Sequence, residues 1–79
     1  MTTLRLFASA REAAGRACDE FSDVATVGDV LVEAVARYGE GFARLLPTCR
    51  VWVNGEPACH DTTVTLRDEV AVLPPVSGG

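Results

Sequence analysis

The chain has 79 residues and carries seven basic side chains, all of them arginine, against eleven acidic ones, for a net charge of −4. An acidic surface of this kind is a poor electrostatic match for nucleic acid or for an anionic membrane, so neither is expected as a partner. A chain of this length holds one small domain, and a hydrophobic content of 48% is sufficient for a folded core.

The sequence shows neither the pattern of a targeting signal nor a cysteine motif for redox chemistry or metal binding. The first residues contain no apolar region of the kind that signal peptides carry, and no apolar run approaches the ~20 residues of a membrane span. The cysteines, Cys18, Cys49 and Cys59, include no CxxC pair, so neither a disulfide framework nor a metal site is indicated. We therefore expect a soluble cytoplasmic protein with reduced thiols and with no bound metal or cofactor.

A strand pattern opens the chain. Alternation over residues 3–8 places Leu4 and Leu6 on one face and Arg5 and Phe7 on the other. A short helical turn is expected next, over residues 11–14.

Ser9 is the expected cap of that turn and Gly15 its end. A weaker pattern predicts a second strand over residues 17–21.

The clearest element is an amphipathic helix over residues 27–38. Thr26 and Asp29 have the spacing of a capping box, and apolar residues then recur every three or four positions until a glycine ends the pattern. Glu33 and Arg37 are expected to pair at i, i+4 on the opposite face. A second short helical turn is expected to end before a proline at position 47.

A hairpin pattern follows. Residues 51–53 and 56–58 flank the dipeptide Asn54-Gly55, which favours a two-residue type I′ turn. The proline in the second of these strands predicts an edge position, because proline cannot donate a ladder hydrogen bond. The last strand is expected over residues 69–73.

Two strands, one main helix and further strands indicate an α+β domain, with a mixed sheet of about five strands and the helix packed on one face. The expected folded body spans residues 1–73, and residues 74–79 form an extended tail. Its six residues are Pro74, Pro75, Val76, Ser77, Gly78 and Gly79.

The tail favours a chemical role for the terminal carboxylate of Gly79, although a frayed terminus would also end in small residues. The two prolines stiffen its base, and the six residues could span about 20 Å at roughly 3.3 Å per residue. Glycine imposes no Cβ clash, so Gly78 and Gly79 could enter a narrow active site of another protein. An enzyme could there transfer AMP from ATP to the carboxylate.

The sequence resembles the MoaD-type sulfur carriers, the small subunits of molybdopterin synthase. The resemblance is carried by residues 72–79, which read Val-Leu-Pro-Pro-Val-Ser-Gly-Gly, and is supported by residues 4–8, 11–15 and 51–55. One departure is the turn at residues 66–70, where relatives usually carry a glycine–aspartate step and this chain has no glycine.

The resemblance implies a β-grasp, ubiquitin-like fold and a defined chemistry. A ubiquitin-activating-type adenylyltransferase would use ATP to adenylate Gly79, and a sulfurtransferase would supply the sulfur of a thiocarboxylate. Gly78 would provide clearance. The large subunit of molybdopterin synthase, in a heterotetramer, would accept the tail and provide the catalytic groups.

The strand alternation also predicts a partner-binding patch on the sheet face away from the helix. Its expected members are Phe7, Trp52, Ala71 and Leu73. The alternative is that Phe7 and Trp52 only cover each other.

The chain shows no catalytic apparatus of its own. Cys59 and His60 are adjacent, and adjacent side chains in an extended segment point in opposite directions. Asp19, Glu20 and Asp23 are interpreted as a solvated edge.

Three other functions stay open: a sulfur carrier for thiazole or cysteine biosynthesis, a ubiquitin-like protein modifier, and a plain interaction module.

Overall fold

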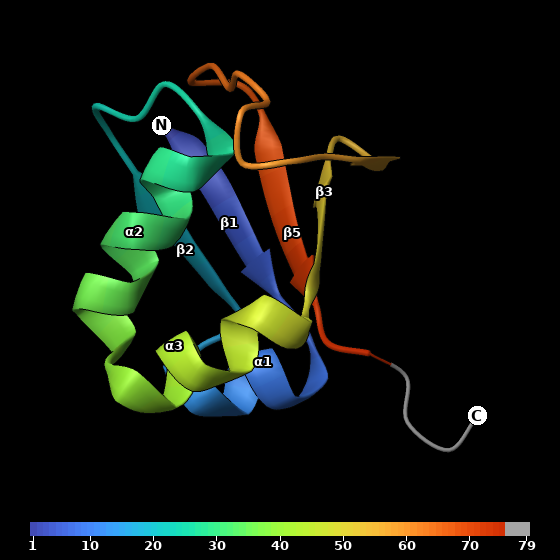
Figure 1. Ribbon diagram of the computed structural model, residues 1–79. Helices are drawn as coiled ribbons and strands as arrows, with labels where there is room; N and C mark the ends of the chain where they lie inside the picture. Colours follow the sequence, from blue (N-terminus) through green and yellow to red (C-terminus); the bar gives the residue numbers. More distant parts are fainter. Residues whose placement is uncertain (76–79) are drawn as a thin grey trace.

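The computed structural model describes residues 1–75 and shows a five-stranded mixed sheet with helices on one side (Figure 1). The strands are β1 (Thr2–Leu6), β2 (Cys18–Phe21), β3 (Arg50–Val53), β4 (Glu56–Pro57) and β5 (Glu69–Leu73). Their order across the sheet is β2-β1-β5-β3-β4, in which β1 and β5 are parallel and all other neighbours are antiparallel. The predicted α+β class is confirmed.

The helical layer contains more than the one predicted main helix. Its members are α1 (Ala8–Ala14), α2 (Val27–Tyr38), α3 (Glu40–Leu45) and the 3₁₀ turn η1 (Leu46–Thr48). Helix α2 runs along the sheet, while α1 and α3 lie beside each other near the end where β1 and β5 finish (Figure 1).

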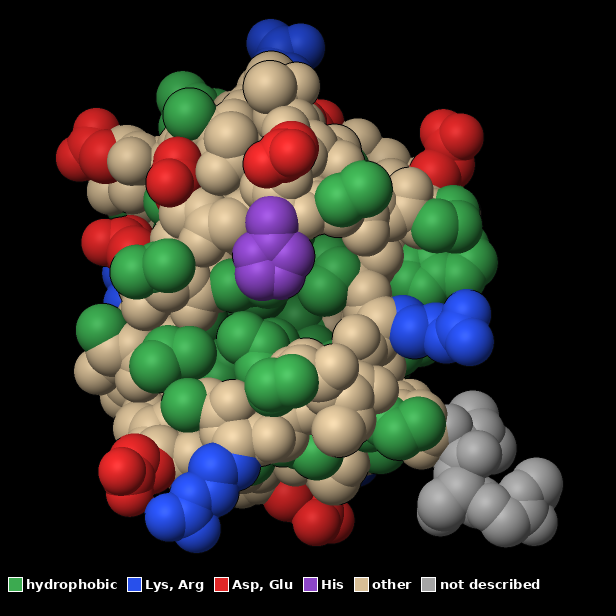
Figure 2. Space-filling model, viewed as in Figure 1, with side chains coloured by type: hydrophobic (Ala, Val, Ile, Leu, Met, Phe, Trp, Pro, Cys, Tyr) green, Lys and Arg blue, Asp and Glu red, His purple; other side chains and the backbone are tan. Residues whose placement is uncertain are grey.

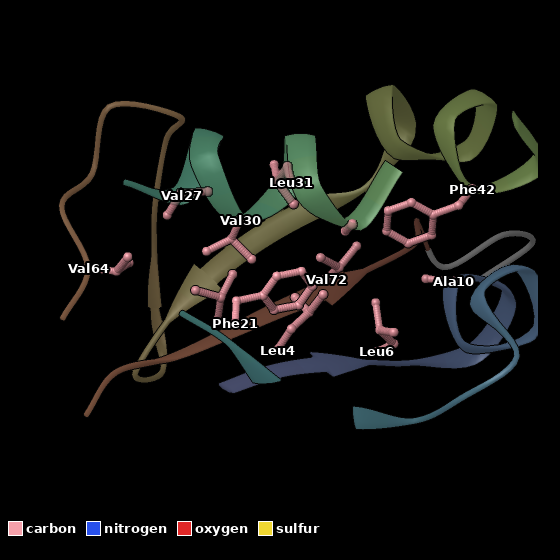
Figure 3. Close-up of a cluster of buried hydrophobic side chains, with 12 residues drawn as sticks. Leu4, Leu6, Ala10, Phe21, Val27, Val30, Leu31, Phe42, Val64 and Val72 are labelled. Atoms are coloured by element: carbon pink, nitrogen blue, oxygen red, sulfur yellow. The ribbon is translucent and has the colours of Figure 1, made fainter. Parts of the chain in front are cut away.

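The core fills the space between this layer and the sheet. Figure 3 shows Phe21, Leu4 and Val72 rising from the strands beneath Val30 and Leu31 of α2. Complete burial of a side chain of this size stabilises the fold by roughly 1.5–3 kcal/mol. The alternation that places Leu4 and Val72 in this core leaves every second residue of the same strands on the opposite face.

Helix α1 begins earlier than the sequence pattern predicts. It starts at Ala8, which the pattern assigned to the first strand, and its N-cap residue is Phe7, which makes no side-chain capping bond. The prediction that Ser9 caps the helix is wrong, because Ser9 lies inside it. Gly15 ends the helix as predicted, with φ of 79° and its N–H donated to the carbonyl of Arg11.

The predicted capping box of α2 is confirmed. The N–H of Asp29 donates to Thr26 Oγ1 at 3.2 Å, and the N–H of Thr26 donates to Asp29 Oδ2 at 3.2 Å. These bonds satisfy backbone donors that would otherwise lack partners at the start of a helix.

The predicted Glu33–Arg37 ion pair is wrong. Arg37 instead reaches strand β2, where its Nη1 lies 3.1 Å from Asp19 Oδ2 and donates to the carbonyl of Glu20 at 3.0 Å. Its guanidinium also lies 4.1 Å from the ring centroid of Phe21, in cation–π geometry. Arg37 therefore pairs with Asp19, which is distant in the sequence, and not with Glu33 on its own helix.

Asp19 is therefore no part of a solvated edge, since its side chain is only 12% exposed. It accepts hydrogen bonds from the Tyr38 hydroxyl at 2.7 Å and the Glu20 N–H at 2.8 Å, and it lies 3.3 Å from Arg16 Nη1. Burial alone would raise the pKa of Asp19, but the bonds from Tyr38, Glu20 and Arg37 outweigh it and hold the pKa below its ordinary value. The carboxylate clamps the C-terminal end of α2 to β2.

The second short helix, α3, covers Glu40–Leu45 and ends before the proline, as predicted, although it begins earlier than the pattern indicated. The separate 3₁₀ turn η1 follows and includes Pro47 in its first turn. A proline is tolerated in the first turn of a helix, because its missing N–H would have no partner there.

The hairpin between β3 and β4 has the predicted turn. Asn54 and Gly55 both have positive φ, at 50° and 83°, as a type I′ turn requires. The Asn54 side chain also donates to Asp68 Oδ1 and accepts from the Glu69 N–H, each at 2.9 Å.

These bonds also account for the turn that lacks the usual glycine. Asp68 Oδ2 accepts the N–H of Thr65 at 2.8 Å, and its own N–H donates to the carbonyl of Thr65 at 3.1 Å. None of residues 66–69 has a positive φ, so this turn has no position that demands glycine.

No helix within residues 1–75 combines the length and the apolar content needed to cross a bilayer.

Replacing Asp19 with asparagine is expected to lower the free energy of unfolding at pH 7 by about 1–3 kcal/mol, because hydrogen bonds to a charged group are lost. The folded-state pKa of Asp19 is depressed, so the stabilisation is present above the unfolded pKa of about 3.9 and disappears as the pH falls through the folded pKa. Urea unfolding at pH 7 and at about pH 3 measures both effects.

The matched control is Glu33→Gln, on the exposed side of the same helix, for which a change within about 0.5 kcal/mol is expected. Equal stability of the two variants at pH 7 would show that the Asp19 clamp contributes nothing.

Candidate functional site

The sheet face away from the helices carries the predicted patch. Residues directly opposite on neighbouring strands point to the same face, and the register pairs Arg50 with Leu73 and Trp52 with Ala71. Val70 and Val72, which alternate with Ala71 and Leu73, are fully buried on the helical side.

Phe7, Trp52, Ala71 and Leu73, which we call the open-face patch, line one hollow of about 340 Å³ together with Gly55 and Glu69. Phe7 is 42% exposed, and the other three members of the patch are half-buried. The structure thus brings together all four residues that the alternation assigned to this face.

Phe7 and Trp52 line the same hollow and are not in close ring contact with each other. The close pair of aromatic rings in the described part of the chain lies elsewhere. That pair is Tyr38 and Phe42, whose centroids are 5.1 Å apart at an interplanar angle of 79°. Large apolar side chains around an open hollow are typical of surfaces that receive a partner's side chain.

Charged residues border the open-face patch on two sides. Next to Ala71, Arg5 Nε lies 2.7 Å from Glu69 Oε2 in a partly exposed ion pair. At the other end of the patch, Arg50 is exposed beside Leu73. Sequence reasoning missed Arg50, although its alternation with Trp52 was a signal that could have placed it on this face.

The base of the tail adjoins the patch. Pro74 and Pro75 directly follow Leu73, the last residue of β5 and a member of the patch. The predicted modification site, Gly79, and the other tail positions Val76, Ser77 and Gly78 lie outside the described residues.

A second hollow lies on the helical side, below the single histidine (Figure 2). Its apolar walls include Leu31, Leu46 and Val51, and Cys49 and His60 also line it. A neighbouring hollow shares Leu31, Leu46 and His60 with it and is also lined by Val32, which is 71% exposed.

The adjacent residues Cys59 and His60 are both exposed. Within residues 1–75, no group of three or more histidine, cysteine, aspartate or glutamate side chains is arranged to hold a metal ion.

Comparisons with known proteins point to one family of small proteins. The sequence model of the ThiS family matches residues 4–79. The chain is 39% identical, over an alignment of 88 positions that covers 96% of each protein, to small archaeal modifier protein 3 of Haloferax volcanii.

Solved structures show the same architecture. The crystal structure of SAMP1 from Haloferax volcanii is 32% identical, with a TM-score of 0.81 and coverage of 99% of this chain and 98% of that one. A putative molybdopterin converting factor, subunit 1, from Pyrococcus furiosus is 27% identical, with a TM-score of 0.81 and coverage of 95% and 97%. The β-grasp, ubiquitin-like fold is confirmed.

The three thiols are expected to differ in reactivity. Cys18 and Cys59 are exposed, whereas Cys49 is half-buried and its thiol lies 3.4 Å from the carbonyl of Leu45. Burial raises the pKa of Cys49, so at pH 7.5 less of it is the reactive thiolate. Brief treatment with iodoacetamide should alkylate Cys18 and Cys59 well before Cys49, as measured by peptide mass spectrometry.

The same treatment in urea serves as the control, because unfolding should make the three rates similar. Alkylation of Cys49 first in the folded protein would contradict the structure.

Proposed function

The chain belongs to the ThiS family of small ubiquitin-like sulfur carriers and modifiers, and from that premise we propose that it is a sulfur carrier for molybdopterin synthesis. In this role Gly79 is first adenylated and then thiocarboxylated, and the chain serves as the non-catalytic small subunit of molybdopterin synthase. The observation that carries the proposal is the position of the open-face patch at the base of a tail whose sequence ends in Gly78-Gly79.

The proposed chemistry takes place in the partners. In the activating enzyme, a carboxylate oxygen of Gly79 attacks the α-phosphorus of ATP and pyrophosphate leaves, which creates a mixed anhydride. A persulfide of a sulfurtransferase then attacks the acyl carbon and AMP leaves, which gives an acyl disulfide. A second thiol attacks the outer sulfur of that disulfide, so that a disulfide forms on the enzyme and the thiocarboxylate of Gly79 is released. The chain contributes the acyl group, and Gly78 contributes clearance, because it has no Cβ to contact the walls of a narrow site.

The body contributes recognition. The open-face patch is apolar and hollow, so a partner's apolar side chain can be buried in it while the neighbouring tail extends into that partner. We propose that the patch binds the activating adenylyltransferase and the large synthase subunit in turn, which requires moderate affinity for each. The likeness to a putative molybdopterin converting factor subunit supports this destination for the sulfur.

A second candidate function is protein modification. The likeness to small archaeal modifier proteins 1 and 3 favours it, and the same activated Gly79 would then acylate a lysine amine of a target protein. A carrier for thiazole or cysteine biosynthesis would share the first two chemical steps and differ only in the acceptor of the sulfur.

Intact mass spectrometry of the chain purified from its native host separates these candidates. A sulfur carrier should show the mass increase of one oxygen-to-sulfur exchange, and that increase should map to the peptide that contains Gly79. Deletion of Gly79 should abolish it. Conjugates of higher mass linked through isopeptide bonds, with no sulfur-containing form, would favour the modifier.

Substitution within the open-face patch should weaken partner binding without unfolding the protein. Phe7→Asp or Leu73→Asp is expected to weaken binding to the activating enzyme at least tenfold, because a charge would enter an apolar interface. Calorimetric titration measures the affinity, and thermal melting should show a far smaller effect.

Leu66→Asp is the matched control, because Leu66 is also apolar and 61% exposed but does not line the hollow. Equal affinity of the Phe7, Leu73 and Leu66 variants would remove the open-face patch from the mechanism.

A further inference from the structure

We propose that Arg50 binds a carboxylate of the partner protein, beside the point where the tail of this chain leaves the sheet. The inference rests on the proposed function and names the chemistry of the surface that the open-face patch must meet. That surface carries an apolar side chain for the hollow and, next to it, a carboxylate beside the opening that receives the tail.

The position of Arg50 follows from the register of the sheet. Arg50 is the first residue of β3 and lies directly opposite Leu73, the last residue of β5. Pro74 follows at once, so Arg50 stands one strand away from the point where the tail begins. Its nearest neighbours on the same face are Leu73 across the ladder and Trp52 two residues along the strand.

Arg50 differs from the other arginine on this face in its charge environment. Arg5 is neutralised by Glu69 at 2.7 Å. Within residues 1–75, no carboxylate lies within ion-pair distance of Arg50 and no group accepts a hydrogen bond from its guanidinium; the arginine side chains that donate there are Arg5 and Arg37. A chain with a net charge of −4 thus presents a positive group, beside Leu73 and Trp52, at the base of its tail.

The charge of Arg50 affects which partners can bind. In the free protein the guanidinium is exposed to water, so no free energy of desolvation is spent on it. When a partner covers the open-face patch, water is removed from the guanidinium, at a cost in free energy unless a carboxylate replaces that water. An apolar or basic surface at this place is therefore rejected, and an acidic one is favoured.

The guanidinium also fixes the orientation in which the partner binds. Its planar array of donors can hold a carboxylate through two parallel hydrogen bonds, which fixes orientation as well as proximity. A contact of this kind beside Leu73 would align the base of the tail with the opening in the partner before the glycines enter. Arg50 is in this sense a positioning residue, since it touches neither ATP nor the reacting carboxylate.

The test measures the affinity of the ubiquitin-activating-type adenylyltransferase from the same genome for three Arg50 variants, at about 50 and 300 mM salt. Arg50→Glu is expected to weaken binding at least tenfold at low salt, and Arg50→Gln somewhat less. Arg50→Lys should recover part of the loss, because it keeps the charge but not the paired donors. The loss should shrink at high salt, as screening reduces charge interactions.

Arg67→Glu is the matched control. Arg67 is also exposed, lies in the turn before β5, and makes no ion pair within residues 1–75. Its reversal changes the net charge by the same amount. A change below twofold is expected for it. Similar losses for Arg67→Glu and Arg50→Glu, or no loss for either, would overturn the inference.

The outcome is separable from that of the proposed function. If the wild-type chain is adenylated and Leu73→Asp loses binding while Arg50→Glu binds like the wild type, only the role of Arg50 is refuted. If the wild-type chain neither binds the enzyme nor is adenylated, the proposed function itself fails.

Discussion

The parallel pairing of β1 with β5 is the interaction on which the rest of the structure depends. These strands come from opposite ends of the folded body, so the pairing closes nearly the whole chain into one loop. Leu4 and Leu6 then meet Val70 and Val72 in a fully or almost fully buried row beneath α2. A parallel pair needs a long connection, and here the helices, β2 and the hairpin form that connection.

The same register also builds the open-face patch that we propose as the recognition surface. Because strand side chains alternate, the pairing that buries Val70 and Val72 leaves Ala71 and Leu73 on the open face, beside Trp52. One face of these strands thus stabilises the fold, and the opposite face is the one that we propose for binding.

Local signals in the sequence were sufficient for the elements and insufficient for the contacts between them. The capping box at Thr26 and the turn at Asn54-Gly55 were predicted because each depends on residues within three positions. The partner of Arg37 was not, because Asp19 is eighteen positions away and becomes a neighbour only when β2 lies beside α2. A turn without glycine could likewise be understood only when Asp68 was seen between Thr65 and Asn54.

The separation of faces also bears on how one fold serves carriers and modifiers alike. In the proposed chemistry both activities would use the same acyl activation of a terminal glycine, so the core and the tail could be shared, and the choice of partner would then lie in the surface around the tail. An apolar patch supplies affinity but discriminates weakly, since many partners can bury an apolar side chain. A charge that the partner covers discriminates strongly, because a mismatched partner must desolvate it without compensation. Arg50 lies where a partner on the open-face patch would cover it, whereas Arg5, on the other side of the patch, is already paired with Glu69.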